Sequence, residues 1–114
     1  MHMRVLLALG DAAYREEIAS AFERHQPHFQ VRTVDPQEMT LEAERFQPHL
    51  VVCEGAVGSL VAPRACAWVH LFTDAGLPVA IVQIGQSYRW VKNVRVEDLL
   101  AILEEVEEVF GEDQ

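Results

Sequence analysis

Four polar side chains follow apolar segments of this sequence and are the first candidates for chemistry: Asp11, Glu54, Gln83 and Lys92. In an open α/β sheet, ligands and reacting groups gather at the carboxyl ends of the strands. A carboxylate and an ammonium group at such an edge can form an ion pair. Glu54 therefore has two interpretations, a partner of Lys92 or a solvated loop carboxylate, and the sequence favours neither.

Cys53 with His49 or His70 raises the question of nucleophilic catalysis. A catalytic thiol needs surroundings that favour the thiolate, whereas Cys53 ends an apolar run. His49 stands at the start of that run, at the opposite end of the predicted strand. We therefore predict a buried, inert thiol and no enzymatic activity. The two cysteines and five histidines show no metal-ligand spacing, so we expect no metal and no cofactor.

The composition is that of one globular domain spanning residues 1–114. Half of the residues are hydrophobic, and the net charge is −9. Such a negative charge disfavours nucleic acids and anionic membranes as partners. No apolar run approaches the roughly 18 residues of a membrane helix, and no signal peptide is visible. We therefore expect a cytoplasmic protein.

The N-terminal half alternates strands and helices. Val5–Leu9 is a continuous apolar run, typical of a strand buried on both faces. Asp11 is well placed to cap a helix that ends near His25. Residues 29–34 alternate with a period of two, which predicts an edge strand, and a helix follows from Asp35. Residues 50–53 form a second buried strand.

The C-terminal half offers fewer helix signals. A helix is predicted to begin at Pro63 and to end at Gly76, since the apolar residues recur at helical spacing: Ala67, Trp68, Leu71 and Phe72. Residues 78–82 and 88–91 read as strands. Residues 96–110 carry the apolar stripe of a last helix, whose acidic residues read as a solvated face.

These elements predict a three-layer α/β/α sandwich of the flavodoxin or receiver type, with a mostly parallel sheet. Parallel strands need a long crossover, and only residues 84–87 separate the last two predicted strands. A fourth helix does not fit there. We therefore expect that helix to be absent, with a hairpin or an extended loop over residues 78–91 in its place.

Three stretches then carry a resemblance to a known family. Arg4–Asp11 resembles a first strand that ends in an acidic pair, and Gln47–Glu54 is similar to a run that ends in a phosphorylated Asp. Val91–Leu100 is similar to a fifth strand's Lys and the last helix. In this order they resemble the CheY-like receiver domains of two-component response regulators.

The resemblance implies a degenerate phosphorylation site formed by Asp11, Glu54, Gln83 and Lys92. Family members hold Mg²⁺ with two acidic groups and the acceptor Asp. Here Leu9 and Gly10 stand at the acidic pair, and Glu54 stands at the acceptor position. The expected function is that of a pseudo-receiver in signal transduction, without Mg²⁺ or phosphoryl transfer.

Such a domain would act by protein–protein contact, with a protein partner or as a homodimer, through residues 88–110. The expected interaction residues are Tyr88, Arg89, Trp90 and Leu103, because aromatic residues next to arginine favour binding patches. For Trp90, packing in the core is the alternative, whereas Trp68 is predicted in the core.

A different class of function is binding of a small molecule on a flavodoxin-like scaffold. Its site would lie near Gly10, Gly55, Gly58 and Gln83, where glycines allow close approach of the backbone. The sequence contains neither a GxGxxG motif nor a P-loop.

Overall fold

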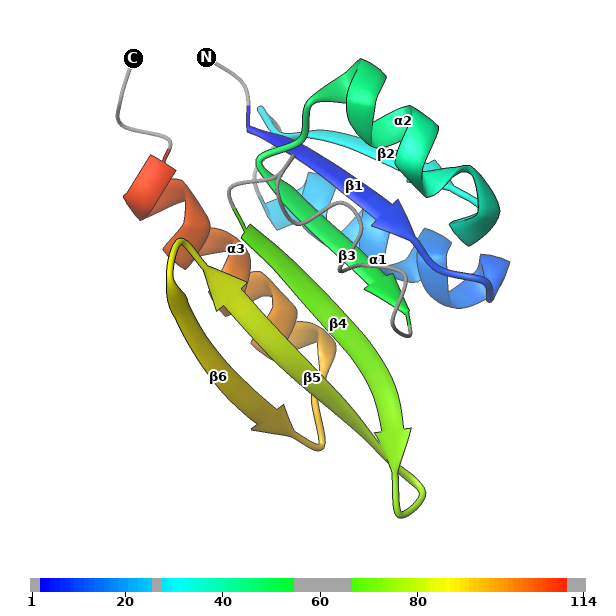
Figure 1. Cartoon of the computed structure of the whole chain (residues 1–114), viewed down its shortest axis with the longest axis vertical. Helices are drawn as coiled ribbons and strands as arrows, with labels where there is room; N and C mark the ends of the chain where they lie inside the picture. The colour runs from blue at the N-terminus through cyan, green and yellow to red at the C-terminus, as the bar shows by residue number, and fades with distance from the viewer. Residues whose placement is uncertain (1–2, 26–27, 55–66, 111–114) are drawn as a thin grey trace.

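The computed structural model describes residues 3–25, 28–54 and 67–110, which form one six-stranded sheet with helices on both faces (Figure 1). The sheet order is β2-β1-β3-β4-β5-β6. In chain order the elements are β1 (Arg4–Ala8), α1 (Ala12–His25), β2 (Gln30–Val34), the 3₁₀ turn η1 (Pro36–Glu38), α2 (Met39–Phe46), β3 (Leu50–Glu54), β4 (Ala67–Asp74), β5 (Leu77–Ile84), β6 (Ser87–Lys92) and α3 (Val96–Phe110).

The N-terminal half is parallel. β1 pairs with both β2 and β3, and β3 pairs with β4, all in parallel. β1 and β3 are continuous apolar runs because helices cover both of their faces. β2 lies at the edge, as its alternation predicted. The Asp11 carboxylate accepts the backbone N–H of Tyr14 at 3.1 Å, so the predicted cap of α1 is confirmed.

The C-terminal half is antiparallel, with β4, β5 and β6 joined by two tight turns. Ala75 and Gly76 connect β4 to β5 with φ angles of 53° and 80°, the pattern of a type I′ turn. Gly85, with φ 61°, is the first of two residues between β5 and β6, as in a type II′ turn. The hairpin predicted for residues 78–91 is therefore confirmed.

The predicted fold class is wrong. The sheet is mixed and its C-terminal half is antiparallel, so the chain is not a mostly parallel sandwich of the flavodoxin or receiver type. The helix predicted across residues 67–72 is strand β4. Its apolar residues form a nearly continuous run, which suits a buried strand as well as a helix face. Pro63, the predicted start of that helix, lies outside the described residues.

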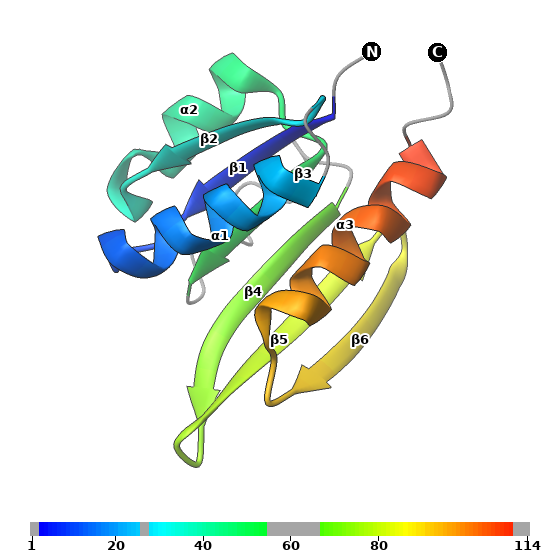
Figure 2. The same cartoon turned by 180° about the vertical axis from the view of Figure 1, so that it is seen from behind.

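Helices cover the two faces of the sheet unequally. α1 and α3 cover one face, here called the α1/α3 face (Figure 2), and enclose the larger core. The opposite face is called the α2 face. There α2 packs over β1, β2 and β3 with Met39 and Ala43. On the α2 face of β5 and β6, no described helix covers the sheet. No described helix is long and apolar enough to span a membrane.

Candidate functional site

Glu54 lies at the carboxyl end of β3, where its side chain forms a hydrogen bond with the backbone that follows β1. Its Oε1 atom accepts the backbone N–H of Gly10 at 2.6 Å. A Cβ atom on Gly10 would lie 3.2 Å from that oxygen, so glycine suits this close approach. Next to it, Asp11 caps α1. Both predicted acidic residues therefore bind backbone amides at the same edge of the sheet.

Lys92 does not join this edge cluster. A row of opposite residues crosses the sheet from Glu54 on β3 to Val91 on β6. Its two middle members are Leu71 on β4 and Ala80 on β5. Residues opposite each other share a face, so Lys92, the next residue along β6, projects from the other face. Three strand spacings, about 14 Å, also separate β3 from β6. Of the two interpretations of Glu54, the ion pair with Lys92 is therefore wrong.

Gln83 is also remote from Glu54. β5 runs antiparallel to β3, so its carboxyl end lies at the opposite edge of the sheet, where Gln83 is opposite Trp68. Its amide nitrogen donates to the Gly85 carbonyl at 3.1 Å, within its own hairpin. The predicted cluster followed the resemblance to receiver domains, whose sheet is parallel, and the reversed direction of β5 moves Gln83 to the other end of the strands. Gly55 and Gly58, the other residues of the predicted ligand site, lie outside the described residues.

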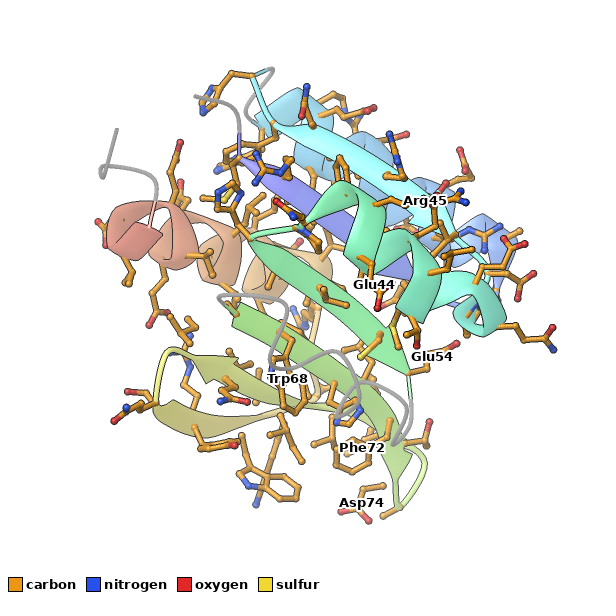
Figure 3. All side chains as sticks on the ribbon, turned by 45° about the horizontal axis from the view of Figure 1, so that its top comes forward. Glu44, Arg45, Glu54, Trp68, Phe72 and Asp74 are labelled. Atoms are coloured by element: carbon orange, nitrogen blue, oxygen red, sulfur yellow. The ribbon has the colours of Figure 1, made fainter. Side chains whose placement is uncertain are left out.

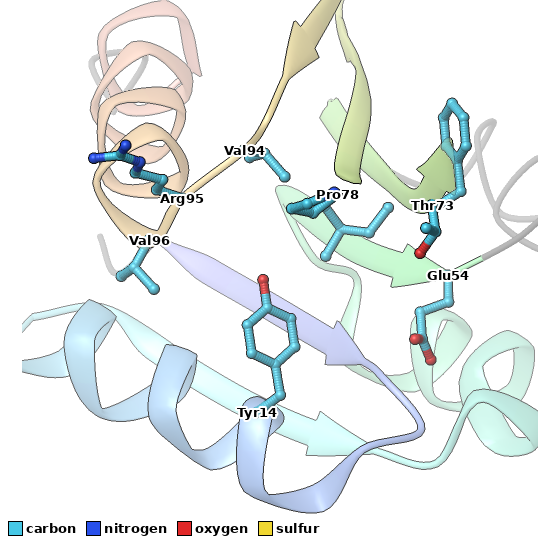
Figure 4. Close-up of a pocket in the computed structure, with 9 residues that line it drawn as sticks. Tyr14, Glu54, Thr73, Pro78, Val94, Arg95 and Val96 are labelled. Atoms are coloured by element: carbon cyan, nitrogen blue, oxygen red, sulfur yellow. The ribbon is translucent and has the colours of Figure 1, made fainter. Parts of the chain in front are cut away.

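A pocket of about 350 Å³ opens at the carboxyl edge of the parallel strands, between the first turns of α1 and α3 (Figure 4). Its walls are mostly apolar, and the Tyr14 hydroxyl points into it. Burial raises the pKa of Tyr14, and the carboxylates of Glu17 and Glu54 add to this effect. The lining residues are Tyr14, Glu54, Leu71, Phe72, Thr73, Pro78, Val94, Arg95 and Val96. This lining offers hydrogen-bond acceptors and a carboxylate beside an apolar wall.

Cys53 is a buried thiol, as predicted. Its side chain is 1% exposed, and its Sγ atom lies 3.6 Å from the Val69 carbonyl oxygen. Burial, with a smaller contribution from Glu54, raises its pKa to about 12. His70 is the cross-strand neighbour of Cys53, and burial lowers the pKa of that imidazole. The thiol is therefore protonated near neutral pH, which disfavours nucleophilic chemistry.

His49 has a structural partner at the other edge of the sheet. Its Nδ1 atom accepts the backbone N–H of Arg4 at 3.0 Å, and the backbone N–H of His49 donates to the Arg4 carbonyl at 2.8 Å. Burial, with a smaller contribution from Arg4, lowers the pKa of His49. Among the described residues no group of three or more histidine, cysteine, aspartate or glutamate side chains is placed to hold a metal ion.

The largest exposed aromatic side chains lie on β6, at the edge of the sheet. Tyr88 is 64% exposed and Trp90 is 60% exposed, so both stand at the surface as predicted for an interaction site. The Trp90 ring meets the Phe72 ring edge to face, with centroids 5.7 Å apart. Ile81 is half-buried between them, opposite Trp90. We call these four residues the aromatic patch; Figure 3 shows Phe72 on its strand.

The other two predicted interaction residues lie elsewhere. Arg89 projects from the α1/α3 face, where its guanidinium donates two hydrogen bonds to the Glu105 carboxylate at 2.6 and 2.9 Å. This pairing raises the pKa of Arg89 and lowers that of Glu105. Leu103 is fully buried in the core between helices and sheet. The prediction of Leu103 as an interaction residue is therefore wrong, because the apolar stripe of α3 faces the sheet.

Three buried polar atoms near the patch were not anticipated: Trp68 Nε1, His70 Nε2 and Gln83 Oε1. None of them has a hydrogen-bond partner within the described part of the chain. All three side chains share the α2 face of β4 and β5. Recognising residues 67–74 as a strand would have placed them together, because every second residue of a strand shares a face. Trp68 itself is 7% exposed, so its predicted core position is confirmed.

No family model matches this chain, and neither a curated protein nor a solved structure is similar enough to count as a match.

Proposed function

We propose that this domain is a protein-binding module that pairs an extended segment of another chain with the β6 edge. The observation that carries the proposal is the aromatic patch, which lies beside that edge on the part of the α2 face that no described helix covers. An exposed sheet edge offers backbone hydrogen bonds for affinity, and neighbouring side chains provide specificity. Such binding needs neither phosphorylation nor Mg²⁺. We keep the expectation that the module is cytoplasmic and not an enzyme.

The hairpin geometry identifies which backbone groups of β6 point outward. Ile84 and Ser87 close a two-residue turn, so they form a hydrogen-bonded pair. Hydrogen-bonded and non-hydrogen-bonded pairs alternate along an antiparallel ladder. Tyr88, Trp90 and Lys92 therefore belong to the non-hydrogen-bonded pairs, and their N–H and C=O groups point away from β5. Tyr88 and Trp90 therefore combine an exposed aromatic side chain with backbone groups that are free to pair with another strand.

The side chains of these outward positions add apolar area beside the free edge. A tyrosine or tryptophan contributes roughly 150–250 Å² when fully buried. At roughly 25 cal/mol per Å², covering the exposed parts of Tyr88 and Trp90 is worth several kcal/mol before the costs of association. Binding energy of this size suits a reversible interaction.

A test uses a displayed library of extended peptides, selected against the whole chain. We expect binders whose affinity falls at least tenfold with Trp90→Ala and further with Trp90→Pro, which also removes an outward N–H. Leu41→Ala is the matched control, since Leu41 is 52% exposed on α2, away from β6. Selection of binders that none of the β6 variants weakens, or of no binder at all, would overturn the proposal.

The pocket favours a second candidate function, recognition of a small molecule. Its position at the carboxyl edge of the parallel strands is where α/β sheets usually bind ligands. Because Glu54 contributes a carboxylate and Tyr14 a hydroxyl, the preferred ligand would be a small amine with an apolar body. A thermal-shift screen of primary amines tests this idea, with the corresponding carboxylic acids as controls. A stabilising amine should lose its effect with Glu54→Gln; equal shifts from amines and acids would exclude it.

A further inference from the structure

We infer that the segment that pairs with β6 is β6 of a second copy of this chain, related to the first by a two-fold axis. This inference rests on the proposed function and names the partner. The two β6 strands would run antiparallel and join two six-stranded sheets into one. The evidence is the direction of the free backbone groups of β6 and the existence of a register in which its two cations, Arg89 and Lys92, do not lie opposite each other.

The free backbone groups restrict how two copies can pair. Only Tyr88, Trp90 and Lys92 present their N–H and C=O groups outward, so these positions must meet each other across the two-fold axis. If the axis passes through Trp90, then Trp90 faces Trp90 of the partner subunit, and Tyr88 faces Lys92 of the partner subunit. Aromatic pairs and contacts between a cation and an aromatic ring are both favourable across strands.

The same register avoids like charges on the other face of the sheet. Arg89 is then opposite Val91 of the partner subunit, and its guanidinium keeps its own Glu105 carboxylate as a partner. Lys92 has no ion pair among the described residues and gains an aromatic neighbour. No lysine or arginine of β6 faces another directly. Because like charges opposite each other destabilise a pair of strands, this register is favoured.

The acidic helix favours an antiparallel arrangement over a parallel one. Four glutamates lie in the second half of α3: Glu104, Glu105, Glu107 and Glu108. The ion pair of Glu105 with Arg89 fixes this half beside the start of β6. An antiparallel pair of β6 strands places the two acidic helix ends at opposite ends of the seam. A parallel pair would bring them together, in a chain that already carries a net charge of −9.

The size of the contact predicts a weak dimer. Four aromatic side chains at roughly 150–250 Å² each, only partly available, give less than the roughly 1,200 Å² of a standard specific interface. The net charge of each copy also opposes association. We therefore expect a dissociation constant on the order of micromolar or weaker, with tighter association at higher salt, because salt screens repulsion between the copies.

Sedimentation equilibrium of the whole chain, over protein concentrations from about 5 to 500 µM, tests the inference. We expect a monomer–dimer equilibrium whose dissociation constant falls severalfold between about 20 mM and 300 mM NaCl, across which the Debye length shortens. Trp90→Pro and Tyr88→Lys should raise the dissociation constant at least tenfold. Leu41→Ala should leave it unchanged. A monomer throughout the range, or a dimer unaffected by both β6 variants, would overturn the inference.

Disulfide trapping tests the register independently of stability. In a Cys66→Ser background, the double variant Tyr88→Cys/Lys92→Cys should form covalent dimers, because the two positions meet across the axis. Each single variant should cross-link at least tenfold more slowly. Equal rates for single and double variants would contradict the register. The endogenous Cys53 thiol is buried and protonated, so it contributes little to cross-linking.

The two proposals fail in distinguishable ways. If the chain is a monomer but library peptides still bind in a Trp90-dependent manner, the second copy is the wrong partner and the protein-binding function stands. If neither the second copy nor any peptide pairs with β6, both are wrong. If the chain is a monomer and positively charged library peptides bind it in a Trp90-dependent manner that weakens at higher salt, a basic partner takes the place of the second copy.

Discussion

The two halves of the sheet use their α2 face differently. Leu6 on β1 is 0% exposed beneath α2, whereas Trp90 on β6, which projects from the same face, is 60% exposed. The parallel half has helices on both faces, and its polar candidates serve the fold: Glu54 binds Gly10, and His49 binds Arg4. The antiparallel half leaves apolar surface uncovered by described helices. The contrast teaches that exposed apolar surface, which a partner could cover, is concentrated on the part of the α2 face that no described helix covers.

The largest effect should come from truncating one side chain in each half, both on the α2 face. Leu6→Ala should lower the free energy of unfolding by about 3 kcal/mol, because it leaves a cavity in a packed core. Ile81→Ala, half-exposed on β5, should cost about 1 kcal/mol because it removes less buried area. Urea unfolding of both variants measures the difference. Equal costs would mean that the α2 face of β5 is as well covered as that of β1.

The second prediction concerns His49, which belongs to the parallel half. Its pKa is lowered in the folded chain, so the unfolded chain takes up a proton first as the pH falls. The contribution of His49 to the free energy of unfolding is therefore fully present above a pH of about 6.5, the ordinary histidine pKa. It declines as the pH falls toward the lowered pKa of the folded chain. Protonation also removes the acceptor for the Arg4 N–H, worth about 1 kcal/mol.

Unfolding free energies measured between pH 8 and pH 5 check this prediction. His49→Gln should flatten the dependence. His70→Gln in the antiparallel half should flatten the dependence less, because burial lowers the pKa of His70 as well but protonation of its ring breaks no hydrogen bond of Nε2 among the described residues. A pH dependence that persists unchanged in His49→Gln would contradict the assignment.

A third prediction sharpens the comparison within the hairpin. Ala75 has a φ angle of 53°, a conformation that costs an L residue roughly 1–2 kcal/mol. Ala75→Gly removes that strain and adds the smaller entropic cost of glycine, for a net gain of about 0.8 kcal/mol. Gly76→Ala, at φ 80°, should destabilise the same turn. Thermal unfolding of the two variants should therefore shift the midpoint in opposite directions.

The smallest expected effect is at the ion pair between Arg89 and Glu105. Both side chains are nearly half-exposed, at 46% and 40%, so solvent screens their attraction. Their two-point geometry still suggests a coupling energy of about 0.4 kcal/mol. A double-mutant cycle with Arg89→Met and Glu105→Gln, repeated at high salt, measures it. Coupling above about 2 kcal/mol, typical of buried pairs, would show that α3 is held to β6 mainly by charge.

Local sequence signals predicted much of the fold. The buried strands at residues 4–8 and 50–54, the cap at Asp11 and the last helix all follow from short-range patterns, and the structure has each of them. The short separation between the last two apolar runs, residues 84–87, also predicted the last hairpin. The segment at residues 67–74 was misread because its apolar residues satisfy both helical and strand spacing, and the choice depends on the strands beside it.

For the candidate site, too, the local sequence predicted one part, and the other part depended on contacts between distant strands. The side chains near the first strand end, Asp11 and Glu54, were predicted together and lie at the same edge. Gln83 and Lys92 were assigned to that edge from the resemblance to receiver domains. β5 is reversed, which moves Gln83 to the other end of the strands, and Lys92 lies three strands away from Glu54 on the other face. Exposure of Tyr88 was predicted correctly, and for Trp90 the structure decides between the two alternatives in favour of the surface. The predicted strand at residues 88–91 already implied that Arg89 and Trp90 lie on opposite faces, but only the structure shows that α3 covers the face of Arg89.

The sequence by itself determined which segments are apolar, where they stop and how much charge the chain carries, because these properties depend on neighbouring residues. Only the tertiary structure decided that β5 runs antiparallel to β4 and that β6 lies three strands away from β3. These two facts decide which side chains lie together and which part of the α2 face no described helix covers. Strand direction depends on contacts between residues far apart in the chain. A reversed strand keeps its apolar pattern and its two faces but carries the residues at its ends to opposite edges of the sheet.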